Sequence, residues 1–441
     1  MQVLVVGSGA REHALVRALA ADPQVTGVVA APGNPGIARN ARVAALDRVT
    51  DGEAVARLAV EHAVDLVVVG PEVPLVAGVA DDVRAAGIPC FGPSAEAARL
   101  EGSKAFAKEV MAAAGVPTGA AHVCTTVEQV AGALDALGPP HVVKDDGLAA
   151  GKGVLVTDDR TAALEHARAA LAKADGRVVV EEYLDGPEVS LFCLSDGRTV
   201  VPLEPAQDFK RVGEGDTGPN TGGMGAYSPL GWAPGGLVEE VLDRIARPTV
   251  AEMARRGTPF VGTLFLGLAL TSRGPRVIEF NARFGDPETQ VVLARLRTPL
   301  AGLLSAAATG RLDAVVPLRW SPEHVVTVVV AAQGYPAAPR AGDAIEGLAD
   351  AEEVPAAYVL HAGTTRDVDG TLRSSGGRVL SVVAAGDTLA EARERVYAAV
   401  DRIRLDGAHV RRDIGLLAER AEAERRGEAD QRGEAREPTS G

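Results

Sequence analysis

The first hundred residues alternate short apolar runs with helical patterns, and this alternation constrains the fold more than any other feature of the chain. The runs at residues 3–6, 25–30 and 66–69 are predicted to be buried strands, with helices at residues 12–20 and 54–62 between them. Strands that alternate with helices in this way build a parallel sheet with helices on both faces. We therefore expect a Rossmann-like α/β domain over residues 1–100.

Glycine-rich turns follow the carboxyl ends of these strands, where ligands bind in folds of this kind. The turns are Gly7-Ser8-Gly9, Pro32-Gly33-Asn34-Pro35-Gly36 and Gly70-Pro71-Glu72. The first resembles a dinucleotide fingerprint, but Glu12 stands where that fingerprint needs a third glycine. The second strand also lacks a final acidic residue to bind a ribose hydroxyl. These departures argue against a nicotinamide cofactor, and the first turn is either a tight connection or a phosphate site at a helix N-terminus.

The rest of the chain is predicted to form two further blocks and a tail. Residues 101–315 form an α+β block with a helix at 105–114, strands at 141–144, 154–157, 177–183 and 188–194, and a hairpin of residues 264–271 and 276–281. Residues 316–417 form a small α+β domain with strands at 325–332, 359–364 and 378–384 and a helix at 389–403. Residues 418–441 have no apolar face and are predicted to be disordered.

Charge and hydrophobic pattern argue against several classes of protein. The chain has 441 residues, too many for one ordinary core, and a formal charge of −14. A general nucleic-acid binder needs a basic face instead. No apolar run reaches the length of a membrane span, and the N-terminus has no basic leader. Cys90, Cys124 and Cys193 show no pairing or metal spacing, so we expect a cytoplasmic protein, without nucleic-acid or membrane partners.

Residues 147–153 (Gly-Leu-Ala-Ala-Gly-Lys-Gly) lie between two predicted strands and suit a flexible flap over ATP. They do not form a Walker loop, because the glycines are one residue too close and Gly153 replaces the metal-binding Ser or Thr. The glycines would let backbone N–H groups approach a triphosphate, with Lys144 and Lys152 nearby. The alternative is a hairpin loop with an incidental lysine.

Residues 181–188 (Glu-Glu-Tyr-Leu-Asp-Gly-Pro-Glu) end one predicted strand and begin the next. Exposed backbone at such a hinge could pair with an adenine edge, and Glu188 could accept hydrogen bonds from ribose hydroxyls. Acidic residues that flank a turn are common, so this segment is weak evidence by itself.

The strongest stretch is residues 279–288 (Glu-Phe-Asn-Ala-Arg-Phe-Gly-Asp-Pro-Glu). Residues two apart on a strand share a face, so Ile278 and Phe280 are expected in the core and Glu279 and Asn281 on the other side. Two oxygen ligands beside nucleotide phosphates suit Mg²⁺. Arg283 offers a bidentate donor for phosphate or carboxylate oxygens. The alternative is a salt-bridged strand end.

A long segment without regular structure is expected at residues 207–211 and 217–227. Long ordered loops in compact domains are usually functional. Its glycines suggest backbone close to a small ligand, and Lys210 and Arg211 suggest an anion. The alternative is a surface linker.

Taken together, these motifs strongly resemble the phosphoribosylamine–glycine ligase (glycinamide ribonucleotide synthetase) family of ATP-grasp enzymes, over about residues 1–417. The matching stretches are at residues 9–14, 31–34, 69–72, 102–104, 146–153, 218–227, 279–281, 283–288 and 361–364. The resemblance implies an ATP-grasp fold for residues 101–315. It also implies a reaction in which ATP converts the glycine carboxylate into an acyl phosphate, which the amine of 5-phosphoribosylamine attacks.

The resemblance also implies roles for particular residues. ATP contacts would come from Lys104, Lys144, Gly147, Gly151, Lys152, Gly153, Glu181, Glu182, Tyr183, Leu184 and Glu188. Glycine or phosphoribosylamine would be bound by Asp208, Lys210, Arg211, Asn220, Gly222, Gly223, Met224, Gly225, Arg283 and Asp286, and by the weaker candidates Gly9, Asn34 and Glu72. Glu279 and Asn281 would hold Mg²⁺ or Mn²⁺, and Arg283 and Lys152 would neutralise charge on the transferring phosphoryl group. A monomer is expected.

Three departures from the family pattern bear on this interpretation. Asp145 stands where members commonly have Ala or Ser, and Phe209 where they commonly have His. Residues 264–270 contain no second acid for the metal. The alternatives are another ATP-grasp ligase, such as an ATP-dependent carboxylase acting on a purine intermediate, a noncatalytic nucleotide-binding regulator, and an oxidoreductase.

Overall fold

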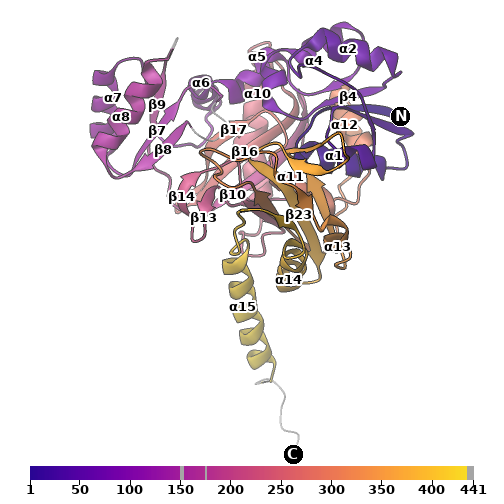
Figure 1. Ribbon diagram of the computed structural model, residues 1–441. Coiled ribbons are helices and arrows are strands. Elements are labelled where there is room, and N and C mark those ends of the chain that lie inside the picture. Colours follow the sequence, from indigo (N-terminus) through magenta and orange to yellow (C-terminus); the bar gives the residue numbers. More distant parts are fainter. Residues whose placement is uncertain (149–152, 174–175, 435–441) are drawn as a thin grey trace, which may run out of the picture.

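The N-terminal domain is a five-stranded parallel sheet with helices on both faces, as predicted. In the computed structural model, which describes residues 1–148, 153–173 and 176–434, its strand order is β3-β2-β1-β4-β5. The domain is the indigo end of the ribbon in Figure 1. The strands are β1 (Gln2–Gly7), β2 (Gly27–Pro32), β3 (Arg42–Val43), β4 (Leu66–Val69) and β5 (Cys90–Phe91). The helices are α1 (Ala10–Ala20), α2 (Gly52–Glu61), α3 (Glu72–Val76), α4 (Val79–Ala85) and α5 (Ala95–Gly102).

Alternate residues of these strands belong to two different cores. Leu4 and Val6 pack with the cluster that includes α2 and α4, whereas Val3 and Val5 pack with the cluster that includes α1. Because successive side chains of a strand point to opposite faces, a continuous apolar strand is buried on both sides. The glycine-rich turns therefore meet at the carboxyl edge of one sheet.

The central domain contains two antiparallel sheets. One has the order β6-β9-β7-β8 and is covered by α7 (Val127–Leu137) and α8 (Arg160–Leu171). Its strands are β6 (Ala121–Cys124), β7 (His141–Asp145), β8 (Val154–Thr157) and β9 (Val178–Glu181). The other has the order β11-β10-β16-β17, with β10 (Glu188–Asp196), β11 (Val200–Pro202), β16 (Val261–Thr271) and β17 (Gly274–Asn281).

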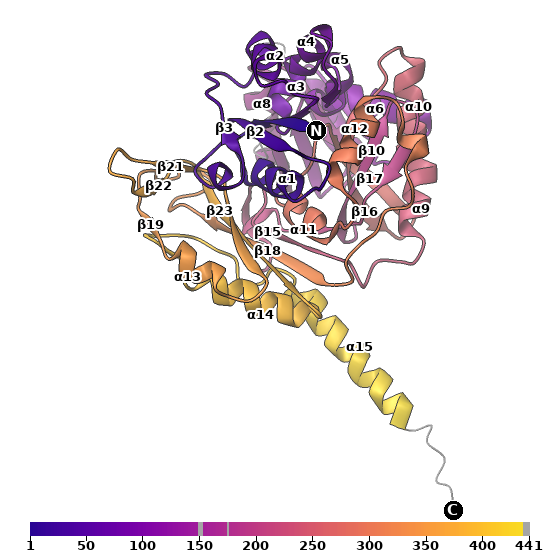
Figure 2. The ribbon, with the colours of Figure 1, turned by 90° about the vertical axis from the view of Figure 1, so that its right-hand side faces the viewer.

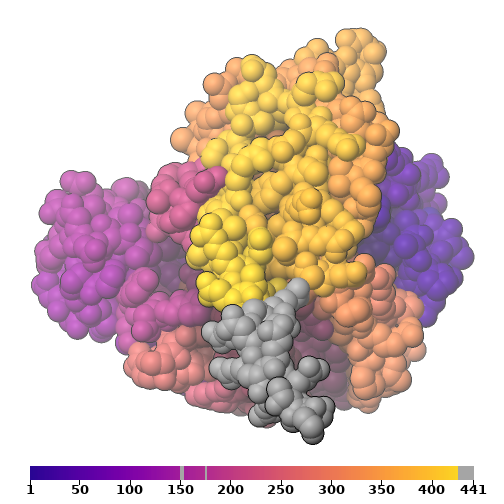
Figure 3. All heavy atoms as spheres, turned by 90° about the horizontal axis from the view of Figure 1, so that it is seen from below, coloured from indigo at the N-terminus to yellow at the C-terminus, as the bar shows by residue number. Residues whose placement is uncertain are grey.

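The predicted hairpin of β16 and β17 is present, and helices pack around the second sheet. They are α6 (Lys104–Ala114), α9 (Leu237–Val241), α10 (Arg247–Arg255), α11 (Glu288–Arg295) and α12 (Leu300–Ala308). The lobe of α7 and α8 projects on one side of the molecule, and the N-terminal domain lies on the other (Figure 3).

The third sheet joins strands from two stretches of the chain, in the order β12-β15-β18-β23-β20. Its strands are β12 (Gln207–Asp208), β15 (Gly225–Ser228), β18 (His324–Ala331), β20 (Ala357–His361) and β23 (Arg378–Gly386). Helices α13 (Leu348–Glu352) and α14 (Leu389–Val400) accompany it. The small strands are β13 (Arg211–Gly213), β14 (Thr217–Asn220), β19 (Ile345–Glu346), β21 (Thr364–Arg366), β22 (Leu372–Ser374) and β24 (Arg404–Leu405).

The expectation of an irregular segment at residues 207–227 is therefore wrong in part, because four short strands lie there. β12 and β15 pair with each other, β13 pairs with β14, and β15 also pairs with β18, which lies about a hundred residues further along. These pairings use backbone groups, so glycine-rich sequence without period-two alternation can still form them.

The expected disorder of the tail is also wrong for most of its length, because α15 spans Leu416–Glu434 and extends away from the body (Figure 2). Glu419 forms an ion pair with Arg393, and Arg425 Nη1 donates to the carbonyl of Gly231 at 3.1 Å. Ala, Glu and Arg have high helix propensity, so this segment can form a helix without an apolar stripe. Within the described ranges, no helix is long and apolar enough to cross a membrane.

The N- and C-terminal domains meet at two buried histidines. His361 donates its backbone N–H to His13 Nδ1 at 2.8 Å, and the rings lie 5.9 Å apart. Asn34 Nδ2 donates to the carbonyls of Ser8 and His361, and its Oδ1 accepts from Gly36 and Ile37. All four hydrogen-bonding positions of this amide are thus used within the protein.

We expect this interface to weaken in acid. Burial lowers the pKa of His13 from 6.5 to about 3 and that of His361 to about 4. In the unfolded chain both histidines take up a proton near pH 6.5, whereas in the folded protein they stay neutral down to about pH 3 and 4. The free energy of unfolding is therefore unaffected by these groups above pH 6.5 and falls as the pH is lowered from 6.5 towards those values. Each histidine should contribute a slope of up to about 1.4 kcal/mol per pH unit. Denaturant unfolding at several pH values should show a shallower slope for His13→Gln than for the wild type. The exposed His122→Gln is the control, and equal slopes in all three proteins would contradict this account.

The tail should contribute stability only through its first turns. Ala418 packs against the main core, and Glu419 and Arg425 make the contacts described above. Removing residues 426–441 should leave the melting temperature unchanged, whereas removing residues 416–441 should lower it by about 1–3 °C. Calorimetry of both truncated proteins checks this, and equal losses would show that the distal half also stabilises the body.

Candidate active site

Lysines line the space where the two central sheets meet. Lys144 on β7 donates to the carbonyl of Ile278 on β17 at 3.0 Å, which joins the two sheets, and lies 3.0 Å from Glu181 Oε2. Lys104, the first residue of α6, donates to the carbonyl of Gly147 at 2.9 Å. Burial and the neighbouring Lys144 lower the pKa of Lys104, and Glu279 opposes them. The buried Lys144 and the half-buried Lys104 at the root of the predicted flap form an arrangement suited to an anionic ligand.

Asp145 points away from these lysines. Its carboxylate pairs with Lys173 and lies 3.0 Å from His166 Nε2, the latter on α8. Because adjacent residues of a strand face opposite sides, Asp145 lies on the helix-covered face of β7 and Lys144 on the other. Asp145 is thus held by Lys173 and His166 on the face opposite Lys144, although its charge still acts on Lys104.

The root of the flap is fixed on the N-terminal side. Asp146 accepts from Ser103 Oγ at 3.0 Å and from the backbone of Ala105 at 3.2 Å. Gly147 has φ of +120°, a conformation that favours glycine. Gly153 accepts the backbone N–H of Asp145 through its carbonyl. The predicted contacts Gly151 and Lys152 lie outside the described residues.

At the hinge after β9, the two carboxylates are paired with basic side chains, and the backbone offers hydrogen-bonding groups to a ligand. Glu181 is buried between Lys144 and Lys108, the latter at 3.3 Å, and Glu182 pairs with Arg273 at 2.6 Å. Within the described residues, the backbone N–H groups of Tyr183 and Leu184 donate to no other part of the chain. The adenine edge predicted for residues 181–184 would therefore meet the backbone of these two residues.

Glu279 lies among positive charges. Burial raises its pKa, but Lys210, Lys144, Lys104 and Arg283 outweigh burial and hold the pKa below its ordinary value. The carboxylate is thus ionised at neutral pH and able to bind a divalent cation. Within the described residues, no three or more His, Cys, Asp or Glu side chains converge on a metal position. Glu279 and Asn281 would need phosphate oxygens to complete a metal site, which fits Mg²⁺.

The alternation predicted around Glu279 needs a correction. Phe280 is buried as expected, but Ile278 is only half-buried, and Val277 lies in the core instead. The pairing of β17 with β16 shifts register between Gly267 and Leu268, and this irregularity breaks the strict two-residue period.

Arg283 is paired with acids other than Glu279. Its Nε lies 3.3 Å from Glu72 Oε2 and its Nη2 lies 3.3 Å from Glu101 Oε1. Burial lowers the pKa of Arg283, but Glu101 and Glu72 hold it above its ordinary value. Glu101 also accepts the backbone N–H of Ala282 at 2.7 Å. Sequence reasoning missed Glu101, because an acid at the end of a helix resembles any solvent-facing residue.

Two further acids lie near this centre and were not found together by sequence. Ser190 Oγ donates to Glu288 Oε1 at 3.0 Å and lies 3.4 Å from Asp208 Oδ1. Burial and the nearby Asp208 raise the pKa of Glu288 to about 7, and burial raises the pKa of Asp208. Glu279 also contributes to raising the pKa of Asp208, so Asp208, Glu288 and Glu279 form one cluster of interacting acids, whereas residues 264–270 contain none.

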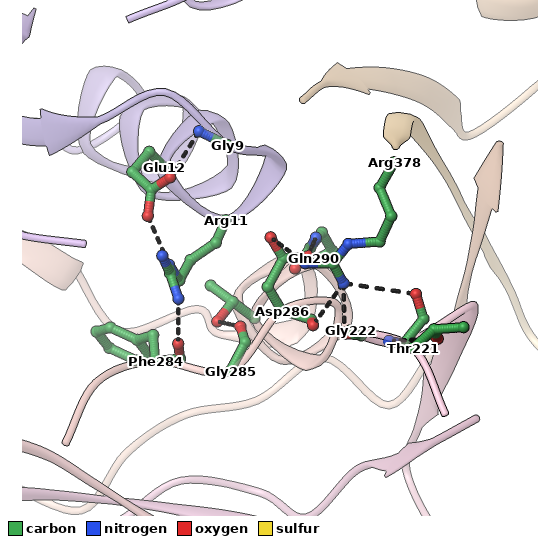
Figure 4. Close-up of polar contacts among 12 residues, drawn as sticks. Gly9, Arg11, Glu12, Thr221, Gly222, Phe284, Gly285, Asp286, Gln290 and Arg378 are labelled. Atoms are coloured by element: carbon green, nitrogen blue, oxygen red, sulfur yellow. Dashed lines mark hydrogen bonds and ion pairs between the residues drawn. The ribbon is translucent and has the colours of Figure 1, made fainter. Parts of the chain in front are cut away.

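The turn after β1 holds a carboxylate of the chain itself. Glu12 Oε2 accepts the backbone N–H of Gly9 at 2.7 Å, and Glu12 Oε1 pairs with Arg11 at 2.5 Å (Figure 4). A Cβ at Gly7, Gly9 or Gly70 would approach the Glu12 side chain within 2.2–2.8 Å. The glycines make room for Glu12, so the structure favours the tight turn over a phosphate at this helix N-terminus.

Asp286 lies where all three domains meet (Figure 4). It accepts from Gln290 Nε2 at 2.8 Å and pairs with Arg378 Nη2 at 3.4 Å. Burial raises its pKa, but Arg378, Arg11 and Arg283 hold the pKa below its ordinary value. Its Oδ2 lies 3.7 Å from the position of a Cβ on Gly9. Asp286 is thus an ionised acceptor facing the N-terminal domain.

The backbone N–H groups of residues 221–224 are all hydrogen-bonded within the protein. Thr221 N donates to Lys210, Gly222 N to Tyr335 Oη, and Gly223 N to Thr221 Oγ1. Met224 N donates to the carbonyl of Phe209. These N–H groups are therefore hydrogen-bonded within the protein, and the predicted ligand contact of this backbone stays a prediction.

The charged residues beside this loop are also paired. Lys210 Nζ lies 2.6 Å from Glu188 Oε2, and Arg211 Nη1 donates to the carbonyl of Gly218 at 2.8 Å. Asn220 lies opposite Arg211 in the β13–β14 pair. Lys210 interacts with the acidic centre, since Asp208, Glu188 and Glu279 hold its pKa well above the ordinary value against the effect of burial.

Comparison with known proteins agrees with this geometry. Models of phosphoribosylglycinamide synthetase match residues 1–101 (N domain), 102–289 (ATP-grasp domain) and 325–417 (C domain). Phosphoribosylamine–glycine ligase of Streptomyces coelicolor is 64% identical over 420 residues, covering 95% of this chain and 99% of that protein. The Mycobacterium tuberculosis ligase is 59% identical over 423 residues, covering 95% and 98%.

Solved structures show the same fold. The phosphoribosylamine–glycine ligase of Thermotoga maritima is 32% identical, with a TM-score of 0.79 over 94% of this chain and 100% of that chain. A Hydrogenobacter thermophilus biotin carboxylase domain in complex with MgADP has a TM-score of 0.69 at 18% identity, which shows the fold alone. Two antiparallel sheets facing each other across Lys104, Lys144 and Glu279 define an ATP-grasp enzyme. The chain belongs to the phosphoribosylglycinamide synthetase family.

The glycines of the 221–225 loop should matter for packing. Gly223 has φ of +109°, and a Cβ there would lie 2.4 Å from Pro287 Cδ. Gly223→Ala should lower the free energy of unfolding by about 1–3 kcal/mol. Gly235→Ala is the control, because no described atom lies within 4 Å of its Cβ position beyond its chain neighbours. Denaturant unfolding of both variants measures the difference. A Gly223→Ala protein of unchanged stability but weakened substrate affinity would contradict the packing role and favour the predicted ligand contact.

Proposed function

We propose that this protein joins glycine to 5-phosphoribosylamine at the expense of ATP, giving glycinamide ribonucleotide, ADP and phosphate. Family membership supports the reaction, and the observation that carries it here is the ionised Glu279 surrounded by Lys104, Lys144, Lys210 and Arg283. A triphosphate, a divalent cation and a carboxylate substrate together need such a mixture of cations and acids.

The ATP contacts are proposed as follows. Lys104 and Lys144 bind phosphate oxygens, together with the segment from Gly147 to Gly153, which includes Gly151 and Lys152. The backbone of Tyr183 and Leu184 contacts the adenine, and Glu188 contacts the ribose. Glu279 and Asn281 would hold Mg²⁺, or Mn²⁺ in its place, which would supply positive charge to offset the phosphates. The buried position of Glu181 between Lys108 and Lys144 supports a role in fixing these lysines.

The chemistry has two steps. In the first, a glycine carboxylate oxygen attacks the γ-phosphorus of ATP, the bond to the bridging oxygen breaks, and ADP leaves. In the second, the amine of phosphoribosylamine attacks the carbonyl carbon of glycyl phosphate, phosphate leaves, and the nitrogen loses a proton. Arg283 offsets negative charge on the phosphoryl group, and its pairing with Glu72 and Glu101 keeps it in place. The protein supplies position and charge, so no covalent intermediate with a side chain is needed.

The remaining assignments are proposals of the same kind. Asp208 and Lys210 line the centre, and Asp286 faces the N-terminal domain. These three residues are therefore proposed to bind glycine or phosphoribosylamine. Glu72 remains a candidate through its contact with Arg283, and Gly9 through its nearness to Asp286. The geometry gives little support to a direct ligand contact by Asn34. The protein is proposed to be a cytoplasmic monomer without nucleic-acid or membrane partners.

An omission assay tests this function. ADP and phosphate release is measured with ATP, Mg²⁺, glycine and freshly prepared phosphoribosylamine, and then with each left out. Release that depends on glycine and on the amine is expected. Release that depends on bicarbonate instead would indicate a carboxylase, and nucleotide binding without turnover would indicate a regulator.

The metal assignment predicts a particular variant. Glu279→Gln keeps the shape but removes the charge, so turnover should fall by about 100-fold or more and the Mg²⁺ requirement should rise, with the fold intact. Asn281→Asp should be milder, because an oxygen remains. Glu240→Gln on the exposed face of α9 is the control. Activity is measured against Mg²⁺ concentration alongside thermal melting. A less stable Glu279→Gln protein with an unshifted Mg²⁺ requirement would show that Glu279 is a structural ion-pair partner.

A further inference from the structure

Arg378, the first residue of β23, reaches from the C-terminal domain into the central domain (Figure 4). Its Nη1 donates to the carbonyls of Gly222, Gly223 and Asp286, the last at 2.8 Å. Its Nη2 lies 3.4 Å from the Asp286 carboxylate. One largely buried guanidinium therefore binds both the 221–225 loop and Asp286.

The fit between Arg378 and the loop is close. A Cβ on Gly222 would lie 3.0 Å from Arg378 Cζ, so the guanidinium packs directly on the backbone at Gly222. Tyr335, also from the C-terminal domain, accepts the N–H of the same glycine at 3.1 Å. The C-terminal domain thus contacts Gly222 through both its N–H and its carbonyl.

The loop in turn connects Arg378 to the proposed ligase centre. Thr221 donates its N–H and Oγ1 to the carbonyl of Lys210, whose ammonium lies 2.6 Å from Glu188. Gly223 packs against Pro287, the residue between Asp286 and Glu288. A shift of the Arg378 side chain would therefore move acidic and basic groups on both sides of the centre.

We infer that Arg378 is a positioning residue for the ligase reaction, and that it places Asp286 and the Lys210 segment without touching ATP. The inference rests on the proposed function. Lysine cannot replace Arg378, because an ammonium is a point charge and cannot span acceptors that a planar guanidinium joins. Misplacement of reacting groups by about 1 Å can cost about 100-fold in rate.

The test compares Arg378→Lys and Arg378→Ala with Arg395→Ala. Arg395 lies in the same domain, with its side chain 29% exposed against 23% for Arg378. Among the described residues, its hydrogen-bond and ion-pair partners are Glu391 and the carbonyl of Ala385. kcat/KM for glycine and for phosphoribosylamine should fall by about 30–100-fold in both Arg378 variants. The KM for ATP should change less than about threefold, and Arg395→Ala should retain activity. Added guanidinium at millimolar concentration should restore part of the activity of Arg378→Ala, a result that loss of stability alone would not give.

Two outcomes would overturn the inference. One is near-normal kcat/KM for both substrates in Arg378→Lys and Arg378→Ala. The other is a loss of kcat/KM that Arg395→Ala shares. A loss of kcat/KM in Arg378→Ala that added guanidinium does not relieve, when both Arg378 variants retain wild-type melting temperatures, counts in the same way. If Arg378→Ala does not fold, the comparison of Arg378→Lys with Arg395→Ala decides. Failure of the proposed function itself is distinguished by the wild-type protein, which would then show no glycine-dependent release of ADP.

Discussion

The ion pairs of Arg283 are the interaction on which the arrangement of the site depends. This guanidinium follows the end of β17 and binds Glu72, which begins α3, and Glu101 in α5. Charges taken out of water are retained only when they are paired, and loss of one partner of a buried pair costs about 3–5 kcal/mol. Burial raises the pKa of Glu101, whereas Arg283 and Arg11 outweigh burial and lower that of Glu72. Both acids belong to the N-terminal domain, which is therefore linked electrostatically to the strand that carries Glu279.

A similar logic holds for Lys144. It lies in one sheet of the central domain and donates to the backbone of the other. Its ammonium is buried beside Glu181, which also pairs with Lys108. The lysines are thus fixed by the protein before a nucleotide binds, and binding requires little reorganisation of charge. Pre-organised charge of this kind is the main means by which enzymes of phosphoryl transfer act.

Sequence reasoning recovered the elements whose signals are local. The parallel sheet and the β16–β17 hairpin follow from apolar period and turn chemistry. It failed where the answer lies in distant pairing. Glu101 and Arg378 look like ordinary surface residues until the chain folds, and no local signal shows that Gly222, Gly223 and Gly225 pack against Arg378, Pro287 and Thr327. The tail was misjudged for a different reason, since absence of an apolar face excludes a buried helix but not a solvated one.

The third sheet has a consequence for how the protein is made. β15 ends at residue 228, but its neighbour β18 begins only at residue 324. At synthesis rates of about 5–20 residues per second, β15 therefore waits several seconds for its partner to leave the ribosome. During that interval one edge of β15 has no strand beside it, and unpaired edges are sites of wrong association between chains. The short, glycine-led sequence of β15 offers little surface to a competing strand, which limits that exposure while the remainder of the chain is translated.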